Sequence, residues 1–225
     1  ILPPFNIWTC LSKYLQSIYI SMEKKLNQSK NLNIFVSLMN HMYQKVNNIE
    51  LEIILQLLKE QSHIRELAKK INQSHVTISR KLNYLVKENI LDFKTNGKNK
   101  TFFIKKNISS RSYIFKAEHY KLIKLTKEYP KLSIILQEVI KKTTEKLVIL
   151  FGSYAKFSAK KDSDIDIYIE TNDKSVKEKI EEINSKINVK QGNFDLDSDL
   201  IKEIIKNHII IKGVEGFYEK TKFFD

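Results

Sequence analysis

The sequence predicts an α+β chain in two parts, a helical part that ends in a β-hairpin and a second part with a small mixed sheet and flanking helices. Apolar residues recur at helical spacing between residues 50 and 88, and an Asn-Gly pair then separates two strand-like runs. Further on, an apolar run at 147–151 precedes a strictly alternating run at 164–170. At 225 residues, the chain is long enough for one large domain or two small ones.

Charge is distributed unevenly along the chain. Residues 1–110 carry 17 Lys and Arg against 7 Asp and Glu, whereas residues 111–225 carry 22 against 19. The net charge of +13 suits a polyanionic partner, and the asymmetry indicates a basic binding part followed by a part with another role. The one cysteine excludes an intrachain disulfide framework and a Cys-based zinc site, so we expect a reducing compartment, the cytoplasm.

Residues 1–42 are expected to form an N-terminal extension, to which we assign no function. Their apolar stretches are broken by polar residues and are shorter than a membrane helix. The basic residues follow the apolar part, whereas a signal peptide begins with basic residues. We therefore expect no membrane partner.

Three helices are expected next, at about 50–58, 64–71 and 75–88. Ser74 is a favourable N-cap for the third of them. Two short helices joined by a tight turn, the second with polar and basic residues on its outer side, form the helix-turn-helix arrangement.

A basic hairpin follows these helices. Its strands are expected at 90–93 and 101–104, because the Asn-Gly pair between them favours a tight turn. With this wing, residues 50–107 resemble the winged helix-turn-helix family, which implies binding of double-stranded DNA. The residues expected to contact DNA lie on the third helix and on the wing: His75, Thr77, Arg80, Lys81, Tyr84, Lys94, Lys98 and Lys100. The alternative is that the winged domain is a protein-interaction module.

The residues expected to carry chemistry lie between 147 and 170. A buried strand ends in Gly152-Ser153, where a glycine before a hydroxyl lets backbone N–H groups approach a phosphate closely. In the alternating run, the period of two places Asp164 and Asp166 on one face, where they could share divalent cations.

The pattern Gly152-Ser153, ten residues, then Asp164-x-Asp166 resembles the signature of the polymerase-beta-like nucleotidyltransferase superfamily. More narrowly, residues 149–169 are similar to the minimal nucleotidyltransferases of bacteria and archaea, which include antitoxin partners of HEPN-domain toxins. In that family the Gly-Ser pair holds the triphosphate, two aspartates hold Mg²⁺, and a third carboxylate on a later strand completes the site.

The resemblance implies further site residues. Asp195, within Phe194-Asp195-Leu196, fits the third carboxylate as catalytic residue and metal ligand, and Asp197 on the same face stays open as an alternative. Lys156 falls where a second basic residue that touches phosphate is common. The chain departs from the minimal enzymes at Tyr154 and Phe157, where a basic residue and a glycine are common.

The implied activity is Mg²⁺-dependent transfer of a nucleoside monophosphate, AMP from ATP or another NTP, to an acceptor hydroxyl. The implied partners are double-stranded DNA and an NTP, with a second copy of the chain and a HEPN-type toxin as further candidates. The acceptor stays open, because a protein tyrosine such as one of that toxin, a tRNA end and a small antibiotic all fit. The alternative function is a transcription regulator whose transferase domain senses nucleotide or is inactive.

The expected domain organisation follows these motifs. A winged helix-turn-helix domain is placed at 43–110, a linking helix at 111–130 and the nucleotidyltransferase domain at 131–225.

Overall fold

The computed structural model describes residues 48–97 and 99–225, and residues 49–225 form one compact unit. The extension expected at 1–42 and the wing residue Lys98 lie outside the described residues. Within the described ranges, no helix combines the length and the apolar character that a membrane crossing needs.

The first three described helices confirm the helix-turn-helix prediction. They are α3 (Ile49–Leu57), α4 (Ile64–Ile71) and α5 (His75–Lys87). The Ser74 side chain caps α5 by accepting a hydrogen bond of 3.1 Å from the Thr77 backbone N–H. Leu67 of α4 and three residues of α5 are fully buried against α3: Ile78, Leu82 and Leu85.

A three-stranded sheet completes this part of the unit. The strands are β1 (Ser62–His63), β2 (Leu91–Asn96) and β3 (Asn99–Ile104), in the order β1-β3-β2, and both pairs are antiparallel. The element order helix, strand, helix, helix, strand, strand is that of a winged helix domain. Strand β1 has only two residues, too few for an alternating pattern, and was not predicted.

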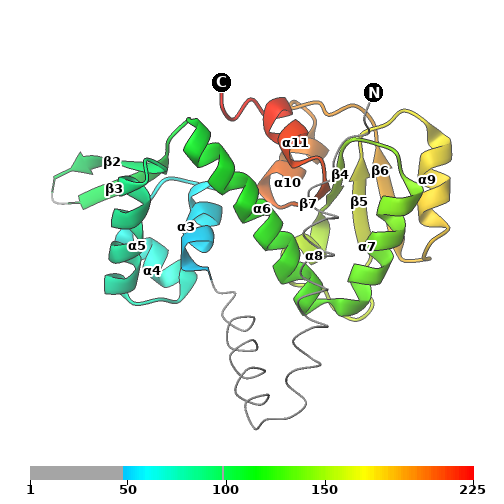
Figure 1. Cartoon of the computed structure of the whole chain (residues 1–225). Coiled ribbons are helices and arrows are strands. Elements are labelled where there is room, and N and C mark those ends of the chain that lie inside the picture. Colours follow the sequence, from blue (N-terminus) through cyan, green and yellow to red (C-terminus); the bar gives the residue numbers. More distant parts are fainter. Residues whose placement is uncertain (1–47, 98) are drawn as a thin grey trace, which may run out of the picture. The chain divides into compact units, whose positions relative to one another are not determined.

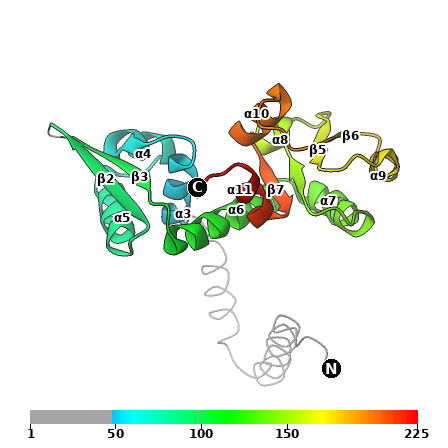
Figure 2. The ribbon, with the colours of Figure 1, turned by 90° about the horizontal axis from the view of Figure 1, so that it is seen from above.

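Helix α6 (Ile108–Glu128) follows the wing and contacts elements on both sides of it. It packs against α3 on one side and against strand β7 (Ile209–Lys212) and helix α11 (Val214–Lys220) on the other. Figures 1 and 2 both show α6 between the winged part and the second sheet. The Asn107 side chain caps it in a capping box with Ser110, and the helix begins three residues before the expected linking helix.

The second sheet has four strands in the order β6-β5-β4-β7. Strand β4 (Val148–Leu150) is antiparallel to both of its neighbours, β5 (Ile165–Ile169) and β7. Strand β6 (Ile187–Gln191) runs parallel to β5. The helices of this part are α7 (Pro130–Lys142), α8 (Gly152–Ala155), α9 (Lys174–Glu181), α10 (Asp199–Lys206) and α11.

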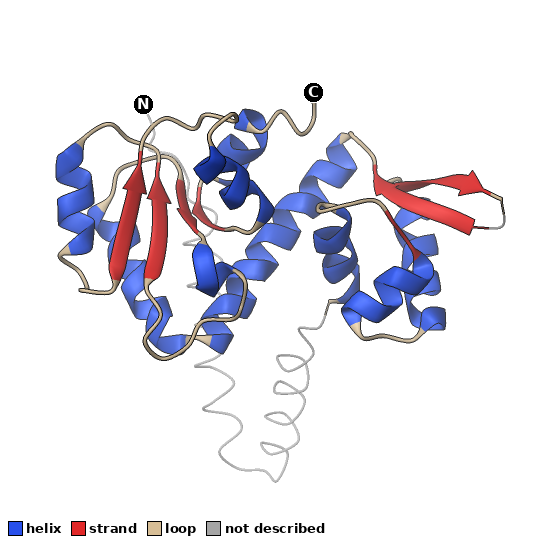
Figure 3. Cartoon of the chain, turned by 180° about the vertical axis from the view of Figure 1, so that it is seen from behind, coloured by secondary structure: helices blue, strands red, loops and turns tan. Residues whose placement is uncertain are grey.

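One face of this sheet is covered by α7 and α9, whose apolar residues share one core with the alternate isoleucines of β5. Those isoleucines are Ile165, Ile167 and Ile169. The residues between them therefore point to the opposite face, which is turned toward the viewer in Figure 3. Asp166 lies on that face, so the sheet presents it away from the α7 and α9 layer.

Candidate active site and candidate nucleic-acid interface

The end of β4 and the start of β5 meet at Gly152 and Asp166. The register pairs Leu150 with Ile167, and the Phe151 N–H donates to the Asp166 carbonyl at 2.9 Å. The chain then turns at Gly152, whose φ of 69° lies in the left-handed region. A Cβ at this position would lie 2.2 Å from Asp166 Oδ2, so only glycine allows the backbone to approach this carboxylate so closely.

Asp164 and Asp166 are the two carboxylates that the sequence pattern placed on one face. Asp164 is exposed just before β5, and Asp166 is half-buried within the strand. Burial raises the pKa of Asp166 above its ordinary value and Asp164 adds to this, whereas a hydrogen bond from Asn188 opposes it. Two adjacent carboxylates open to solvent are a donor set that suits Mg²⁺, which takes few protein ligands and completes its shell with phosphate or water.

The position beside Asp166 on the neighbouring strand is occupied by Asn188. The parallel register pairs the two residues, and Asn188 Nδ2 donates to Asp166 Oδ1 at 3.1 Å. Within the described residues, no group of three or more His, Cys, Asp or Glu side chains is placed to hold a metal. The chain thus presents two carboxylates and an amide where the sequence led us to expect three carboxylates.

Asp195, the expected third carboxylate, is not brought to this pair. Because β6 is parallel to β5, the loop after Gln191 leaves the sheet at the end opposite to Asp164. Asp195 lies exposed in this loop, and its carboxylate accepts a hydrogen bond of 3.0 Å from the backbone N–H of Asp197. Asp197, the alternative candidate for the third carboxylate, lies in the same loop.

Two more of the expected residues lie near the pair. Ser153 follows Gly152 in the short helix α8, and Lys156 caps the end of that helix. The ammonium of Lys156 lies 3.2 Å from a carboxylate oxygen of Glu203 on α10, and the negative charge of Glu203 also acts on Asp166. Glu203 was not predicted, because nothing in its own helical pattern distinguishes it from a solvated face residue.

The backbone of Phe157 adopts a conformation that glycine tolerates best. Its φ of 54° lies in the left-handed region, and it stands where the minimal enzymes commonly have glycine. The Lys124 ammonium lies over the Phe157 ring, 5.7 Å from its centroid.

The outer face of α5 is the candidate nucleic-acid interface of the winged part. Of the residues predicted to contact DNA, His75 and Arg80 are exposed, and Thr77 is half-buried beside the N-cap, where its hydroxyl lies 2.8 Å from Ser74 Oγ. Lys81 is instead turned to α3, where its ammonium pairs with Glu50 at 2.8 Å. Tyr84, although 41% exposed, is hydrogen-bonded to Tyr113 of α6 and so raises the pKa of Tyr113 to about 12.

Two exposed residues of α5 were missed by the sequence analysis. Asn83 and Lys87 are exposed, and with Arg80 they follow one stripe of the helix at intervals of three and four residues. The spacing from Arg80 was the signal that could have identified them.

The wing lysines that the structure describes lie on opposite faces of the hairpin. Directly paired residues share a face, and Lys94 pairs with Thr101 whereas Lys100 pairs with Thr95. Accordingly, Lys94 lies over the Phe103 ring and Lys100 over the Phe93 ring, at 5.5 and 4.0 Å from the centroids.

Comparison with known proteins defines the class of the second part. Residues 134–215 match the family model described as Polymerase beta, Nucleotidyltransferase. This segment contains the Gly-Ser pair and both aspartates, so the class of domain that their spacing predicted is confirmed. No curated protein matches the chain.

Among solved structures, the chain is similar to the homodimeric winged helix-turn-helix DNA-binding domain of a Mycobacterium bovis protein, determined in solution by NMR. The identity is 15%, the alignment covers 45% of this chain and 88% of that one, and the TM-score is 0.27. Because this score is low, the winged fold of residues 49–104 rests on the order and register of its own elements.

Proposed function

We propose that the protein transfers a nucleoside monophosphate, AMP from ATP in the first instance, to an acceptor hydroxyl. The observation that carries this proposal is the close approach of the Gly152 backbone to Asp166, beside Asp164 and on the open face of the sheet. A triphosphate held at Gly152 and Ser153 would lie next to two carboxylates able to share Mg²⁺ with it.

Each residue has a defined task in this reaction. Asp164 and Asp166 would hold Mg²⁺, which when bound neutralises charge on the triphosphate and on the leaving pyrophosphate. Gly152 leaves room for Asp166 to keep its position, and the Ser153 hydroxyl and Lys156 ammonium bind phosphate oxygens. The acceptor oxygen forms a bond to the α-phosphorus, the bond to the pyrophosphate oxygen breaks, and the hydroxyl proton leaves to solvent at the exposed Asp164.

A second candidate function is a transcription regulator in which this domain binds nucleotide with little turnover. It is favoured by Asn188, because an amide that donates to Asp166 supplies no third negative charge for a second metal. In both candidate functions the nucleotide occupies the same site. A measured rate of nucleotidyl transfer distinguishes the enzyme from the regulator.

DNA binding is proposed for the winged part in both candidates. The exposed stripe Arg80, Asn83 and Lys87 would enter the major groove, and Lys94 or Lys100 would neutralise backbone phosphates. The acceptor proposed from the sequence resemblance is a hydroxyl of a HEPN-domain toxin. We also propose that two copies of the chain bind DNA together as a homodimer.

Transfer is tested with ATP labelled at the α-phosphate, Mg²⁺ and the protein product of the neighbouring gene as acceptor. We expect label on the acceptor with the wild type and none with Asp164→Asn or Asp166→Asn. Asp162→Asn is the matched control, because Asp162 is 93% exposed two residues before the pair, and it should label normally. Equal labelling by all four proteins contradicts the catalytic proposal, whereas nucleotide binding without labelling favours the regulator.

DNA binding is tested by the salt dependence of affinity for the protein's own upstream region. Each neutralised phosphate contributes about −0.9 to the slope of log affinity against log salt, so Lys100→Ala should flatten the slope by about one unit. Arg80→Ala should alter sequence preference, and Lys81→Ala, which removes a lysine already paired with Glu50, should change DNA affinity least. A salt-independent affinity, or none, would favour the protein-interaction alternative.

A further inference from the structure

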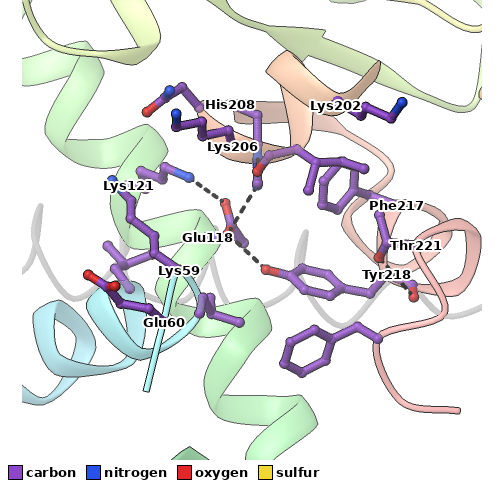
Figure 4. A pocket seen from close by; sticks show the side chains of 15 residues that line it. Lys59, Glu60, Glu118, Lys121, Lys202, Lys206, His208, Phe217, Tyr218 and Thr221 are labelled. Carbon is purple, nitrogen blue, oxygen red and sulfur yellow. Dashed lines mark hydrogen bonds and ion pairs between the residues drawn. The ribbon is translucent and has the colours of Figure 1, made fainter. Parts of the chain in front are cut away.

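A second site lies away from the aspartate pair, in a cavity of about 620 Å³ within the unit of residues 49–225. Its walls come from the end of α3 and the turn after it, from the middle of α6, and from α10 and α11. Figure 4 shows side chains from these elements around one space, with Lys121, His208 and Tyr218 converging on Glu118. The volume is that of an ordinary small-molecule pocket.

The charged lining of this cavity is predominantly basic. Four lysines, Lys59, Lys121, Lys202 and Lys206, face two glutamates. Both glutamates are already engaged, since Glu60 pairs with Lys70 of α4 and Glu118 is surrounded by its own partners. The cavity therefore holds more positive charge than its own carboxylates balance.

Two of these lysines have no counter-charge. Lys59 and Lys206 are exposed, and neither side-chain ammonium forms an ion pair or hydrogen bond in the part of the chain that the structure describes. Lys202 is held at the rim by a hydrogen bond of 2.7 Å to the Asp197 carbonyl. Burial lowers the pKa of Lys121 and the Glu118 carboxylate opposes this, while the charge of Lys59 adds a smaller lowering.

A buried histidine adds a polar atom that faces Glu118 to the same lining. His208 Nδ1 lies 3.0 Å and 3.1 Å from the carbonyl oxygens of Ile204 and Ile205, so this nitrogen carries a proton and donates. Its other nitrogen, Nε2, is buried, makes no hydrogen bond within the described residues and lies 3.4 Å from Glu118 Oε1.

The apolar lining combines three aliphatic side chains, Leu55, Leu58 and Ile205, with aromatic rings. Phe217, Tyr218 and Phe223 follow one another at ring-centroid distances of 5.4 and 5.6 Å, and His208 lies 4.4 Å from Phe217. Phe217 and Tyr218 are buried by these ring contacts, whereas Phe223 is half-buried and can offer its ring to a planar group. A cavity with an aromatic side and unpaired lysines suits a ligand that has a planar ring at one end and several negative charges at the other.

We infer that this cavity binds a nucleoside polyphosphate, with the phosphates at Lys59 and Lys206 and the base against Phe223. This second binding site is separate from the proposed transfer reaction, because binding there uses none of the residues around Asp166 and needs no metal. Lys59 belongs to the turn after α3, and Lys206 ends α10, so one ligand would bridge the winged part and the transferase part.

The test measures ATP binding to the full chain by calorimetry in the presence of EDTA, which removes the metal that the aspartate site requires. We expect wild-type protein to bind, and the double variant Lys59→Gln, Lys206→Gln to bind at least tenfold more weakly. The control double variant Lys131→Gln, Lys142→Gln removes the same charge from exposed positions of α7 and should bind as the wild type does.

Two further measurements complete the test. Asp164→Asn, Asp166→Asn protein should keep metal-free binding, so that failure of the transfer proposal and failure of this one are separate results. Tripolyphosphate, which has the charge but no base, should bind at least tenfold more weakly than ATP. The inference is overturned if wild-type protein binds no ATP in EDTA, if the Lys59 and Lys206 variant binds equally well, or if tripolyphosphate matches ATP.

Discussion

The approach of Gly152 to Asp166 makes a single methyl group decisive for the candidate active site. In Gly152→Ala the new Cβ would meet Asp166 Oδ2 at 2.2 Å, so the carboxylate has to turn away from its place beside Asp164. Because a displacement of about 1 Å can lower a rate about a hundredfold, we expect a loss of label transfer of that order.

Gly97→Ala is the matched control for this substitution. Gly97 has a similar φ of 59° in the hairpin turn, but nothing lies within 4 Å of an added Cβ. Both variants should lose about 1 kcal/mol of stability from left-handed strain, measured by urea unfolding, and only Gly152→Ala should lose transfer. Equal loss of transfer in both variants would mean that strain, not the carboxylate, is responsible.

Asn188 is the residue at which this site can be strengthened. Asn188→Asp would place a third carboxylate beside Asp166, at the position that the parallel register already defines. Since the affinity of such sites rises with the number of charged ligands, the Mg²⁺ concentration for half-maximal transfer should fall roughly tenfold.

Asn193→Asp adds the same charge in the loop after β6, where Asn193 Oδ1 already accepts a hydrogen bond from Asn172. This control should leave the Mg²⁺ requirement unchanged. If Asn188→Asp also leaves it unchanged, then the side chain at 188 does not face the metal.

Among the elements, α6 contains the most buried charge that the structure describes in this unit. Glu118 is 1% exposed and is surrounded by Lys121, His208 and Tyr218, whose hydroxyl donates to it at 2.9 Å. Burial alone would raise the pKa of Glu118, but these partners lower it from 4.5 to about 2. The carboxylate form therefore stabilises the fold above about pH 4.5, and this contribution is lost as the pH falls from there toward 2.

Glu118→Gln should lower the free energy of unfolding by about 3 kcal/mol at neutral pH, because it removes a buried carboxylate that is the counter-charge of Lys121, whose side chain is only 16% exposed. It should also remove the part of the acid sensitivity between about pH 4.5 and 2 that we expect Glu118 to contribute in the wild type. Glu138→Gln, which breaks an exposed pair with Lys141 on α7, should cost less than about 0.5 kcal/mol. Denaturant unfolding across this pH range compares the three proteins, and equal acid sensitivity in all three would contradict the role of Glu118.

The elements also show where sequence reasoning succeeds and where it stops. Helical spacing and the Ser74 cap predicted α4 and α5 closely, and alternation placed Asp164 and Asp166 together, because such patterns are local. The neighbour of Asp166 was not predictable, since strand pairing is long-range and Phe194-Asp195-Leu196 has a strand-like composition. The pairing of Lys81 with Glu50 was missed for the same reason: the two residues are far apart in sequence.

On the scale of the whole molecule, α6 decides where the chain can be divided. The boundaries proposed from sequence put residues 111–130 in a linker. In the structure, however, Glu118 of α6 accepts a hydrogen bond from Tyr218, and Leu125 of α6 belongs to the hydrophobic core of the second sheet. A fragment of residues 107–225 keeps these contacts, and a fragment of residues 129–225 loses them.

We expect both fragments to fold and to lose DNA binding, but the shorter one should unfold at a markedly lower temperature. Loss of buried apolar contacts and of a buried charge partner each costs several kcal/mol. Circular dichroism melting compares them, with Mg²⁺-dependent ATP binding as the measure of an intact site. Equal melting temperatures would show that α6 belongs to the winged part alone.

The continuous course of α6 has a consequence for the way in which two ligands influence each other. Both halves of the unit pack on the same 21-residue helix, so a ligand that shifts this helix in one half changes the packing free energy in the other. Thermodynamic linkage then makes the influence reciprocal: if nucleotide alters the affinity for DNA by some factor, DNA alters the affinity for nucleotide by the same factor. A promoter fragment would in that case act as an effector of the nucleotide site. The DNA to which the protein is bound would then change its affinity for nucleotide.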